Sequence, residues 1–168
     1  VMCGIAFLFG RSAGQAERVR KMIKEMKHRG PDESGILRLG DSTLGHARLS
    51  IIDLKSGRQP ILNEEGTLAI TFNGEVYNFK ELKQMLVSRH RFTSRTDTEV
   101  ILHLFEDYRE DALPMLDGMF AMVIAGREGF VAARDPLGIK PLYIGKREGL
   151  VHVASEMKAM PRGTEKIC

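Results

Sequence analysis

The residue with the clearest chemical potential is Cys3, near the start of the segment Val1-Met2-Cys3-Gly4-Ile5-Ala6. When cysteine is the first residue of a chain, its thiol attacks while its own α-amine accepts and returns the proton. Ordinary pKa values of about 8 for the amine and about 8.5 for the thiol permit this exchange near neutral pH. The chemistry requires that the residues before Cys3 are removed. The alternative is a small buried hydrophobic residue that opens a strand, because free cysteine is often buried.

Composition excludes several other classes of protein. The chain has 168 residues, 43% of them hydrophobic, which suits one domain with a substantial core. Apolar runs of about 18 residues and a signal-peptide pattern are both missing, so we expect a cytoplasmic protein with no membrane segment. Two cysteines at opposite ends of the sequence fit a reducing compartment. The net charge of +3 is small and is not interleaved with aromatic residues, so we expect no nucleic-acid binding.

Hydrophobic spacing predicts the elements that must position the reactive residues. Apolar residues at i, i+3, i+4 and i+7 predict a helix over residues 19–26 that ends near Gly30. Capping-box patterns at Asn78-x-x-Glu81 and Thr96-x-x-Glu99 predict two more helices, with the buried residues Phe79, Leu82, Met85, Leu86, Val100, Ile101, Leu104 and Phe105. Strands are predicted at residues 5–9, 35–39, 44–52, 68–76, 119–125, 130–134, 142–144 and 150–154. This mixture indicates an α+β domain in which helices cover sheets.

Six further motifs follow Cys3 in order. They are His28-Arg29-Gly30-Pro31-Asp32, Gly45-His46-Ala47-Arg48-Leu49-Ser50-Ile51, Phe72-Asn73-Gly74-Glu75-Val76-Tyr77-Asn78, Thr96-Asp97-Thr98-Glu99-Val100, Arg134-Asp135-Pro136-Leu137-Gly138-Ile139-Lys140-Pro141-Leu142-Tyr143 and Ser155-Glu156-Met157-Lys158-Ala159. Together they resemble the class II glutamine amidotransferase domain, and most of all the glutaminase domain of glutamine-hydrolysing asparagine synthetases. The resemblance covers residues 2 to about 159. It implies an N-terminal-nucleophile hydrolase fold, a four-layer αββα sandwich of two antiparallel sheets between helical layers, and it favours a nucleophilic Cys3.

The resemblance also implies roles for individual residues. Arg48 would hold the α-carboxylate of glutamine, because a planar guanidinium pairs with a carboxylate through two bonds. Asp97 would receive the α-ammonium, and its place at a helix start is expected to keep it ionised. Asn73 and Gly74 would form the oxyanion hole from a side-chain amide and a backbone N–H. The other two substrate-binding positions implied are Ile52 and Glu75.

Each of these assignments has a simpler alternative when the residue is taken alone. Arg48 would be a strand arginine in a solvated salt bridge, and Asp97 a residue favoured at any helix start. Asn73-Gly74 would be a hairpin turn. The polar pair Gly74-Glu75 inside an otherwise apolar strand favours the functional interpretation.

The remaining motif residues are predicted to be structural. Residues 28–32 are expected to shape the loop beside Cys3, with Arg29 in an ion pair. His46 is expected to be packed or hydrogen-bonded, because the α-amine already serves as the base. The five histidines show no metal-ligand spacing, so we predict no metal site. Residues 134–141 are expected to form a turn with ion pairs, and residues 155–158 the edge that faces a second domain.

The implied reaction is hydrolysis of the L-glutamine side-chain amide through a Cys3 γ-glutamyl thioester, without a cofactor. We expect a single glutaminase domain over residues 1–168, since the sequence contains neither a Gly-x-x-x-x-Gly-Lys-Ser/Thr loop nor the family's Ser-Gly-Gly-x-Asp signature. ATP and magnesium would belong to an absent synthetase domain or subunit that receives the ammonia. Two alternatives are a different acceptor, such as a phosphosugar, and a catalytically silent module that binds glutamine or a partner.

Overall fold

The computed structural model describes residues 2–49 and 57–167, which form ten strands and three α-helices. One sheet contains β1 (Gly4–Phe9), β2 (Glu33–Leu39), β3 (Ser42–Arg48), β8 (Tyr143–Arg147), β9 (Leu150–Ala154) and β10 (Glu165–Lys166). The other contains β4 (Ile61–Leu62), β5 (Ala69–Val76), β6 (Gly118–Ala125) and β7 (Phe130–Arg134). The strand orders are β10-β8-β9-β1-β3-β2 and β4-β5-β6-β7, and all pairings are antiparallel. Because β1 lies between β3 and β9, the strand that follows Cys3 is held on both edges.

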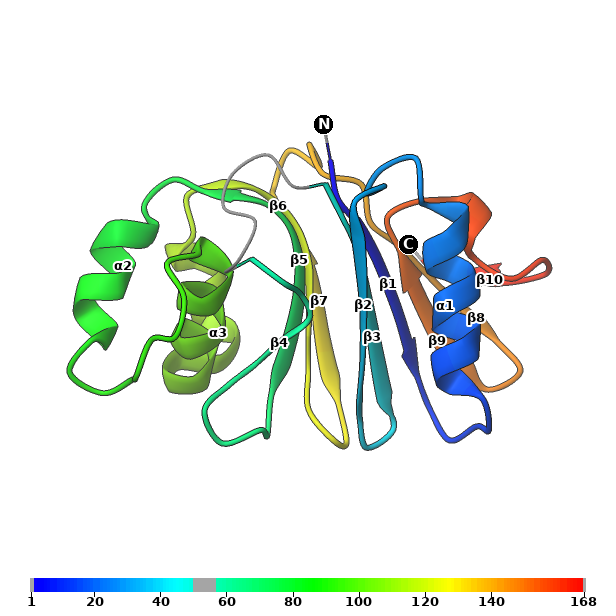
Figure 1. The fold of residues 1–168 in the computed structure, drawn as a ribbon, viewed down its shortest axis with the longest axis horizontal. Coiled ribbons are helices and arrows are strands. Elements are labelled where there is room, and N and C mark those ends of the chain that lie inside the picture. Colours follow the sequence, from blue (N-terminus) through cyan, green and yellow to red (C-terminus); the bar gives the residue numbers. More distant parts are fainter. Residues whose placement is uncertain (1, 50–56, 168) are drawn as a thin grey trace.

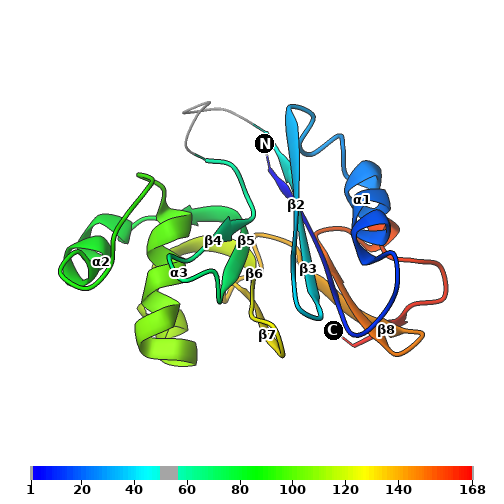
Figure 2. The ribbon, with the colours of Figure 1, turned by 60° about the horizontal axis from the view of Figure 1, so that its bottom comes forward.

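Helices cover the outer face of each sheet (Figures 1 and 2). Helix α1 (Gln15–Glu25) packs on the six-stranded sheet, and α2 (Phe79–Leu86) and α3 (Asp97–Tyr108) lie on the side of the four-stranded sheet. Short 3₁₀ helices follow at Arg109–Met115 and Met157–Ala159. Three separate apolar layers result, of which the central one joins the two sheets through residues such as Phe7, Leu44, Ala121, Val123 and Val153. The αββα sandwich implied by the resemblance is therefore confirmed.

Local sequence patterns predicted most elements within a few residues. Val19, Met22, Ile23 and Met26 are all buried, as the helical spacing indicated. Met85 is an exception, because its side chain is 45% exposed while α2 packs through Leu82 and Leu86. The end of the strand predicted at residues 44–52 lies partly outside the described residues. Within the described ranges, no helix is both long and apolar enough to cross a bilayer.

Both predicted capping boxes differ from the expected form. Asn78 does not cap α2 with its side chain, which instead donates to the Met115 carbonyl and accepts from the Asp117 N–H. At α3, Thr96 accepts from the Glu99 N–H as predicted. The Glu99 carboxylate turns back further than a capping box requires and binds the N–H groups of Thr93 and Ser94. The helices form where they were expected, but long-range bonds replace part of the local capping.

Candidate active site

Cys3 immediately precedes β1 and is fixed by contacts with two distant segments. Its carbonyl accepts a hydrogen bond of 2.9 Å from Arg29 Nε. Two residues later, the Ile5 N–H donates to Ser155 Oγ at 2.9 Å and the Ser155 N–H donates to the Ile5 carbonyl at 3.0 Å. The thiol is free and half-buried. The start of the strand therefore has a defined position even though Cys3 lies close to the first residue of the sequence.

Glu156 holds Arg29 in place. Its Oε1 lies 3.0 Å from Arg29 Nη1 and 2.9 Å from His28 Nε2, and its Oε2 lies 3.3 Å from Lys158 Nζ. Burial alone would raise the pKa of Glu156, but these three partners outweigh burial and lower the pKa to about 2. The expected ion pair of Arg29 is thus present. Residues 155 and 156 serve the strand of Cys3 from within this chain, and their predicted role at the edge toward a second domain stays a prediction.

A cavity of about 310 Å³ opens beside Cys3. Its lining comes from the start of β1, from β5 and the start of β6, from the first residues of α3 and from the segment before β8. Five of the predicted site residues share this cavity: Cys3, Asn73, Gly74, Glu75 and Asp97. Residues that the sequence placed in separate motifs therefore meet in one pocket.

Asn73 and Gly74 lie in the middle of β5, opposite Ala121 and Phe120 of β6, so they do not form a hairpin turn. Asn73 is 3% exposed, and its Nδ2 atom has no hydrogen-bond partner among the residues that the structure describes. A Cβ on Gly74 would lie 2.2 Å from the Met119 carbonyl oxygen, so the close approach of β6 requires glycine there. A buried amide donor without a partner is costly unless it serves a ligand.

The backbone of β5 offers a second donor at the same place. The Phe72 N–H donates to Gln59 Oε1 at 2.6 Å, and the Val76 N–H donates to Asp97 Oδ2 at 3.0 Å. Because successive N–H groups of a strand alternate in direction, the Gly74 N–H points to the same edge, between these two. No hydrogen bond recorded among the described residues occupies it. Asn73 Nδ2 and the Gly74 N–H are both available to a negatively charged oxygen.

Asp97 begins α3 at the far side of the cavity. Its Oδ1 accepts from the Thr98 N–H at 2.8 Å, and its Oδ2 accepts from the Val76 N–H. Burial is the largest effect and raises the pKa of Asp97, although these N–H bonds oppose the shift and Glu75 adds to it. Burial therefore opposes the stabilisation of the charged form that the helix start was expected to give, and the ionised state of Asp97 stays a prediction. A ligand ammonium at this carboxylate would counter the cost of burying its charge.

Arg48 ends β3 and is 7% exposed. Its Nη1 lies 3.4 Å from Glu33 Oε2, and its guanidinium approaches Gly57, where an added Cβ would lie 2.8 Å from Nη2. Gly57 lines the cavity, whereas Arg48 is not among the lining residues. Its role with the α-carboxylate stays a prediction. Ile52, the remaining predicted position, lies outside the described residues.

The structure adds pocket residues that the sequence did not single out. Gln59 lines the cavity, takes the Phe72 N–H and donates to Thr98 Oγ1 at 3.4 Å. Lys140 also lines it and is only 8% exposed, with no ion pair among the described residues. Gln59 belongs to no motif, and the motif of Lys140 predicted a turn with ion pairs rather than a place in the pocket, because both residues reach the pocket through tertiary placement.

Asp135 fixes the segment that carries Lys140. Its carboxylate accepts from the backbone N–H groups of Phe120, Ile139 and Lys140 at 3.2, 2.9 and 3.1 Å. Burial would raise the pKa of Asp135, but these N–H groups dominate and lower it. The predicted turn of residues 134–141 is therefore held by backbone donors to one carboxylate, and it delivers Lys140 to the cavity.

His46 is buried in the structure, outside the residues that line the cavity. Its Nδ1 lies 3.2 Å from Thr71 Oγ1, and burial together with Arg48 lowers its pKa to about 3. The imidazole is therefore neutral at physiological pH. This agrees with the expectation of a packed, hydrogen-bonded histidine.

Comparison with known proteins identifies the family. Residues 2–166 match the family described as a glutamine amidotransferase domain. The chain belongs to this family. It is 45% identical over 168 residues to a probable glutamine-hydrolysing asparagine synthetase of Dictyostelium discoideum and 48% identical over 165 residues to an asparagine synthetase of Asparagus officinalis. These alignments cover 95% of this chain but only 30% and 28% of the relatives, so the chain spans less than a third of their length.

Solved structures support the fold of this amidotransferase domain. The glutamine phosphoribosylpyrophosphate amidotransferase of B. subtilis, solved with ADP and GMP, matches with a TM-score of 0.84 at 24% identity. A structure described as the allosteric regulatory enzyme of purine biosynthesis matches with a TM-score of 0.86 at 25% identity. Each match covers 98% of this chain and 44% of the other chain. The two-sheet architecture is thus shared with enzymes that differ widely from this chain in sequence.

Proposed function

We propose that this amidotransferase domain hydrolyses the side-chain amide of L-glutamine and uses Cys3 as an N-terminal nucleophile. The observation that carries the proposal is the convergence of Cys3, the unpartnered Asn73 Nδ2 and the Gly74 N–H in one cavity with the Asp97 carboxylate. The first three groups are a nucleophile and two oxyanion donors, and the fourth is an acceptor for an α-ammonium. Asp97 and the donors lie along the same strand edge, which suits a substrate with an amino group at one end and an amide at the other.

The reaction then follows from the chemistry of these groups. The Cys3 sulfur attacks the amide carbon while the Cys3 α-amine takes the thiol proton. The carbonyl oxygen becomes negative and accepts hydrogen bonds from Asn73 and Gly74. The intermediate collapses to a γ-glutamyl thioester, and the departing nitrogen receives the proton and leaves as ammonia. Water, deprotonated by the same amine, attacks the thioester and releases glutamate and the free thiol. These steps require no cofactor.

Substrate recognition would rest on charge at both ends of the amino-acid group. Asp97 binds the α-ammonium and Arg48 the α-carboxylate, with Glu75 and Ile52 completing the subsite. Arg48 is held by Glu33 beside Gly57, at the margin of the cavity. Arg48→Lys keeps the charge but loses the paired geometry, so it should raise KM for glutamine with little change in kcat.

The decisive experiment compares two forms of the protein. One begins at Cys3 and the other retains Val1-Met2. We expect the trimmed form to hydrolyse glutamine and to be labelled once, at Cys3, by a diazo-ketone analogue of glutamine. The untrimmed form should be slower by at least ~100-fold, the scale of a lost general base. Cys3→Ala should fold and be inactive, whereas Cys168→Ala should keep activity and labelling. Equal rates of the two forms would refute the mechanism and favour the silent binding module.

We further propose that the ammonia serves an ATP-dependent synthetase domain or subunit. The support is the identity to the glutamine-hydrolysing asparagine synthetases, of which this chain covers less than a third. The isolated chain should release ammonia slowly and form no asparagine from aspartate, ATP and glutamine. Adding the matching synthetase should raise glutamine turnover and restore amide transfer. Turnover on the order of 10² s⁻¹ that no partner changes would instead identify a self-sufficient glutaminase.

A further inference from the structure

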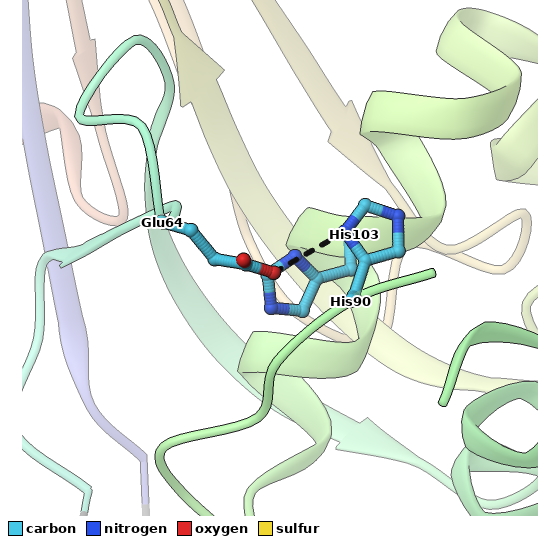
Figure 3. A group of neighbouring side chains, drawn as sticks. All are labelled: Glu64, His90 and His103. Carbon is cyan, nitrogen blue, oxygen red and sulfur yellow. Dashed lines mark ion pairs between the residues drawn. The ribbon is translucent and has the colours of Figure 1, made fainter. Parts of the chain in front are cut away.

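Two histidines and two glutamates meet on the helical side of the four-stranded sheet. Glu64 lies in the turn between β4 and β5, His90 follows α2, and His103 lies within α3 (Figure 3). One ligand atom from each of these three residues lies within 4.8 Å of the others. Glu106, one turn after His103, places its Oε2 2.7 Å from His103 Nδ1 and 3.7 Å from His90 Nδ1. We call Glu64, His90, His103 and Glu106 the histidine cluster.

The separations within the cluster are those of ligands around a small cation. Zinc binds imidazole nitrogen and carboxylate oxygen at about 2.0–2.2 Å, so tetrahedral ligand atoms lie about 3.4 Å apart. His90 Nδ1 lies 3.5 Å from Glu64 Oε1 and 3.7 Å from Glu106 Oε2. The shorter contact of His103 Nδ1 with Glu106 is a hydrogen bond that a metal ion would replace.

A surrounding set of partners orients the ligand groups. Asp107 Oδ1 lies 3.1 Å from His90 Nε2, the second nitrogen of that ring, and Asp107 is itself held by Arg89 at 3.0 Å. This carboxylate–histidine pair is the arrangement that fixes metal-binding imidazoles. Asn63 Nδ2 donates to Glu106 Oε1, and the Arg91 N–H donates to Glu64 Oε1. For His90 and Glu106 the partner binds one atom and leaves the other to face the cluster, whereas the Arg91 N–H binds the same Glu64 oxygen that faces His90 Nδ1.

His103 is the most deeply buried ligand of the cluster. Its side chain is 1% exposed and its Nδ1 faces Glu106, while Nε2, with Glu99 Oε1 at 3.9 Å, makes no hydrogen bond to a described residue. The rings of His90 and His103 are stacked, with centroids 4.5 Å apart and planes inclined by 27°. A shared ion lies in the plane of each ring, so one ring must rotate on binding. His90, at 12% exposure against 1% for His103, is the less confined of the two rings.

We propose that the histidine cluster binds one zinc-type divalent cation through Glu64, His90, His103 and Glu106. Imidazole ligands select such an ion over Mg²⁺ or Ca²⁺, which prefer oxygen alone. The site joins the β4–β5 turn and the segment after α2 to α3, the helix whose first residue is Asp97. Sequence spacing predicted no metal, because the two histidines belong to different segments and meet only in the fold.

The test uses the full chain without an affinity tag, with Cys3→Ala and Cys168→Ala to remove the competing thiols. Equilibrium dialysis with ZnCl₂ should give one ion per chain, and Co²⁺ should give the visible absorption of a tetrahedral site. Both signals should weaken as the pH falls, since protons compete for the ring nitrogens. Zinc should also raise the melting temperature.

Variants of the two ligands that lie outside α3 keep the test independent of the packing of that helix. His90→Gln and Glu64→Gln should each lower zinc affinity at least tenfold. Loss of a residue that only orients a ligand costs about 10–100-fold in metal affinity, so loss of a ligand itself should cost no less. His28→Gln, a half-exposed histidine outside the cluster, is the matched control and should bind zinc normally. Absence of stoichiometric binding, or equal affinity in His90→Gln and His28→Gln, would overturn the proposal.

Discussion

Replacing Asn73 by alanine separates catalysis from stability in this fold. Asn73 Nδ2 is buried and has no partner, so Asn73→Ala removes no hydrogen bond that Nδ2 makes in the folded protein. The free energy of unfolding should therefore stay within about 1 kcal/mol of the wild-type value. If Nδ2 binds the oxyanion, the transition state loses one of two donors. Loss of such a donor costs about 10²–10³ in kcat, or about 3–4 kcal/mol.

Asn63 provides the matched control for this substitution. It is also a buried asparagine, but its Oδ1 accepts from the Thr67 and Leu68 N–H groups at 2.8 and 2.9 Å. Asn63→Ala leaves these donors without their acceptor, which should cost about 1–3 kcal/mol of stability. Asn63 does not line the cavity, so kcat should not change. The two asparagines should thus show opposite effects.

The assay measures glutamate formation by protein that begins at Cys3, with urea unfolding followed in parallel. KM for glutamine should change little in Asn73→Ala, because the oxyanion forms only after binding. A wild-type kcat in this variant would refute the oxyanion assignment. If Asn73→Ala and Asn63→Ala lost the same amount of stability and kcat fell with it, the fall in kcat would have a structural cause.

Three further predictions concern the pocket and its support. Burial raises the pKa of Asp97 in the free protein, and a bound ammonium would lower it. The kcat/KM for glutamine should therefore fall as the pH drops through the pKa of Asp97 in the free protein. Asp97→Asn should abolish this loss of kcat/KM at low pH. Lys140→Met removes a buried cation from the cavity, so kcat/KM for glutamine should fall about tenfold or more, the scale of a hydrogen bond to a charged group. The exposed control Lys146→Met should leave kcat/KM unchanged. The pKa of Glu156 is lowered to about 2, so its ionised form stabilises the fold above the ordinary pKa of 4.5, and this stabilisation is lost as the pH falls toward 2. Urea unfolding should therefore show that Glu156→Gln is about 1–2 kcal/mol less stable than the wild type at pH 7 and no different near pH 2.

The sequence predicted the fold well where periodicity or motif order carries the information. The spacing of Val19, Met22, Ile23 and Met26 sufficed for α1, because one amphipathic face packs on one sheet. The same spacing rule was wrong for Met85, because which residues of α2 are buried depends on where the neighbouring elements pack against it.

Site residues divide in the same way. Asn73 and Gly74 stood out because polar residues interrupt an apolar strand, a local signal. No local signal placed Lys140 in the cavity, because it reaches the cavity only through the turn that backbone N–H groups and Asp135 hold in place. His90 and His103 likewise come from separate segments, and only the packing of α3 against the loop after α2 brings them together.

The candidate site depends on one incomplete strand edge. β4 contains two residues and pairs only with Ala69 and Ile70, so within residues 2–49 and 57–167 no strand lies beside the rest of that edge of β5. Unpaired strand edges are normally a liability because their N–H groups invite other chains. Here Gln59 takes the Phe72 N–H, and Asp97 takes the Val76 N–H.

Between them lies the Gly74 N–H, which we propose as the oxyanion donor. Alternate residues of a strand are about 6.6–6.8 Å apart, so the oxyanion donor and the group that positions Asp97 are separated by a fixed length of backbone. Asp97 Oδ2 is itself anchored to that backbone, 3.0 Å from the Val76 nitrogen. In the proposed mechanism, the strand therefore sets the spacing between the acceptor for the α-ammonium and the donor for the amide oxygen. We expect a shorter amino-acid amide, such as asparagine, to reach only one of them, so the proposed glutaminase should select glutamine over asparagine.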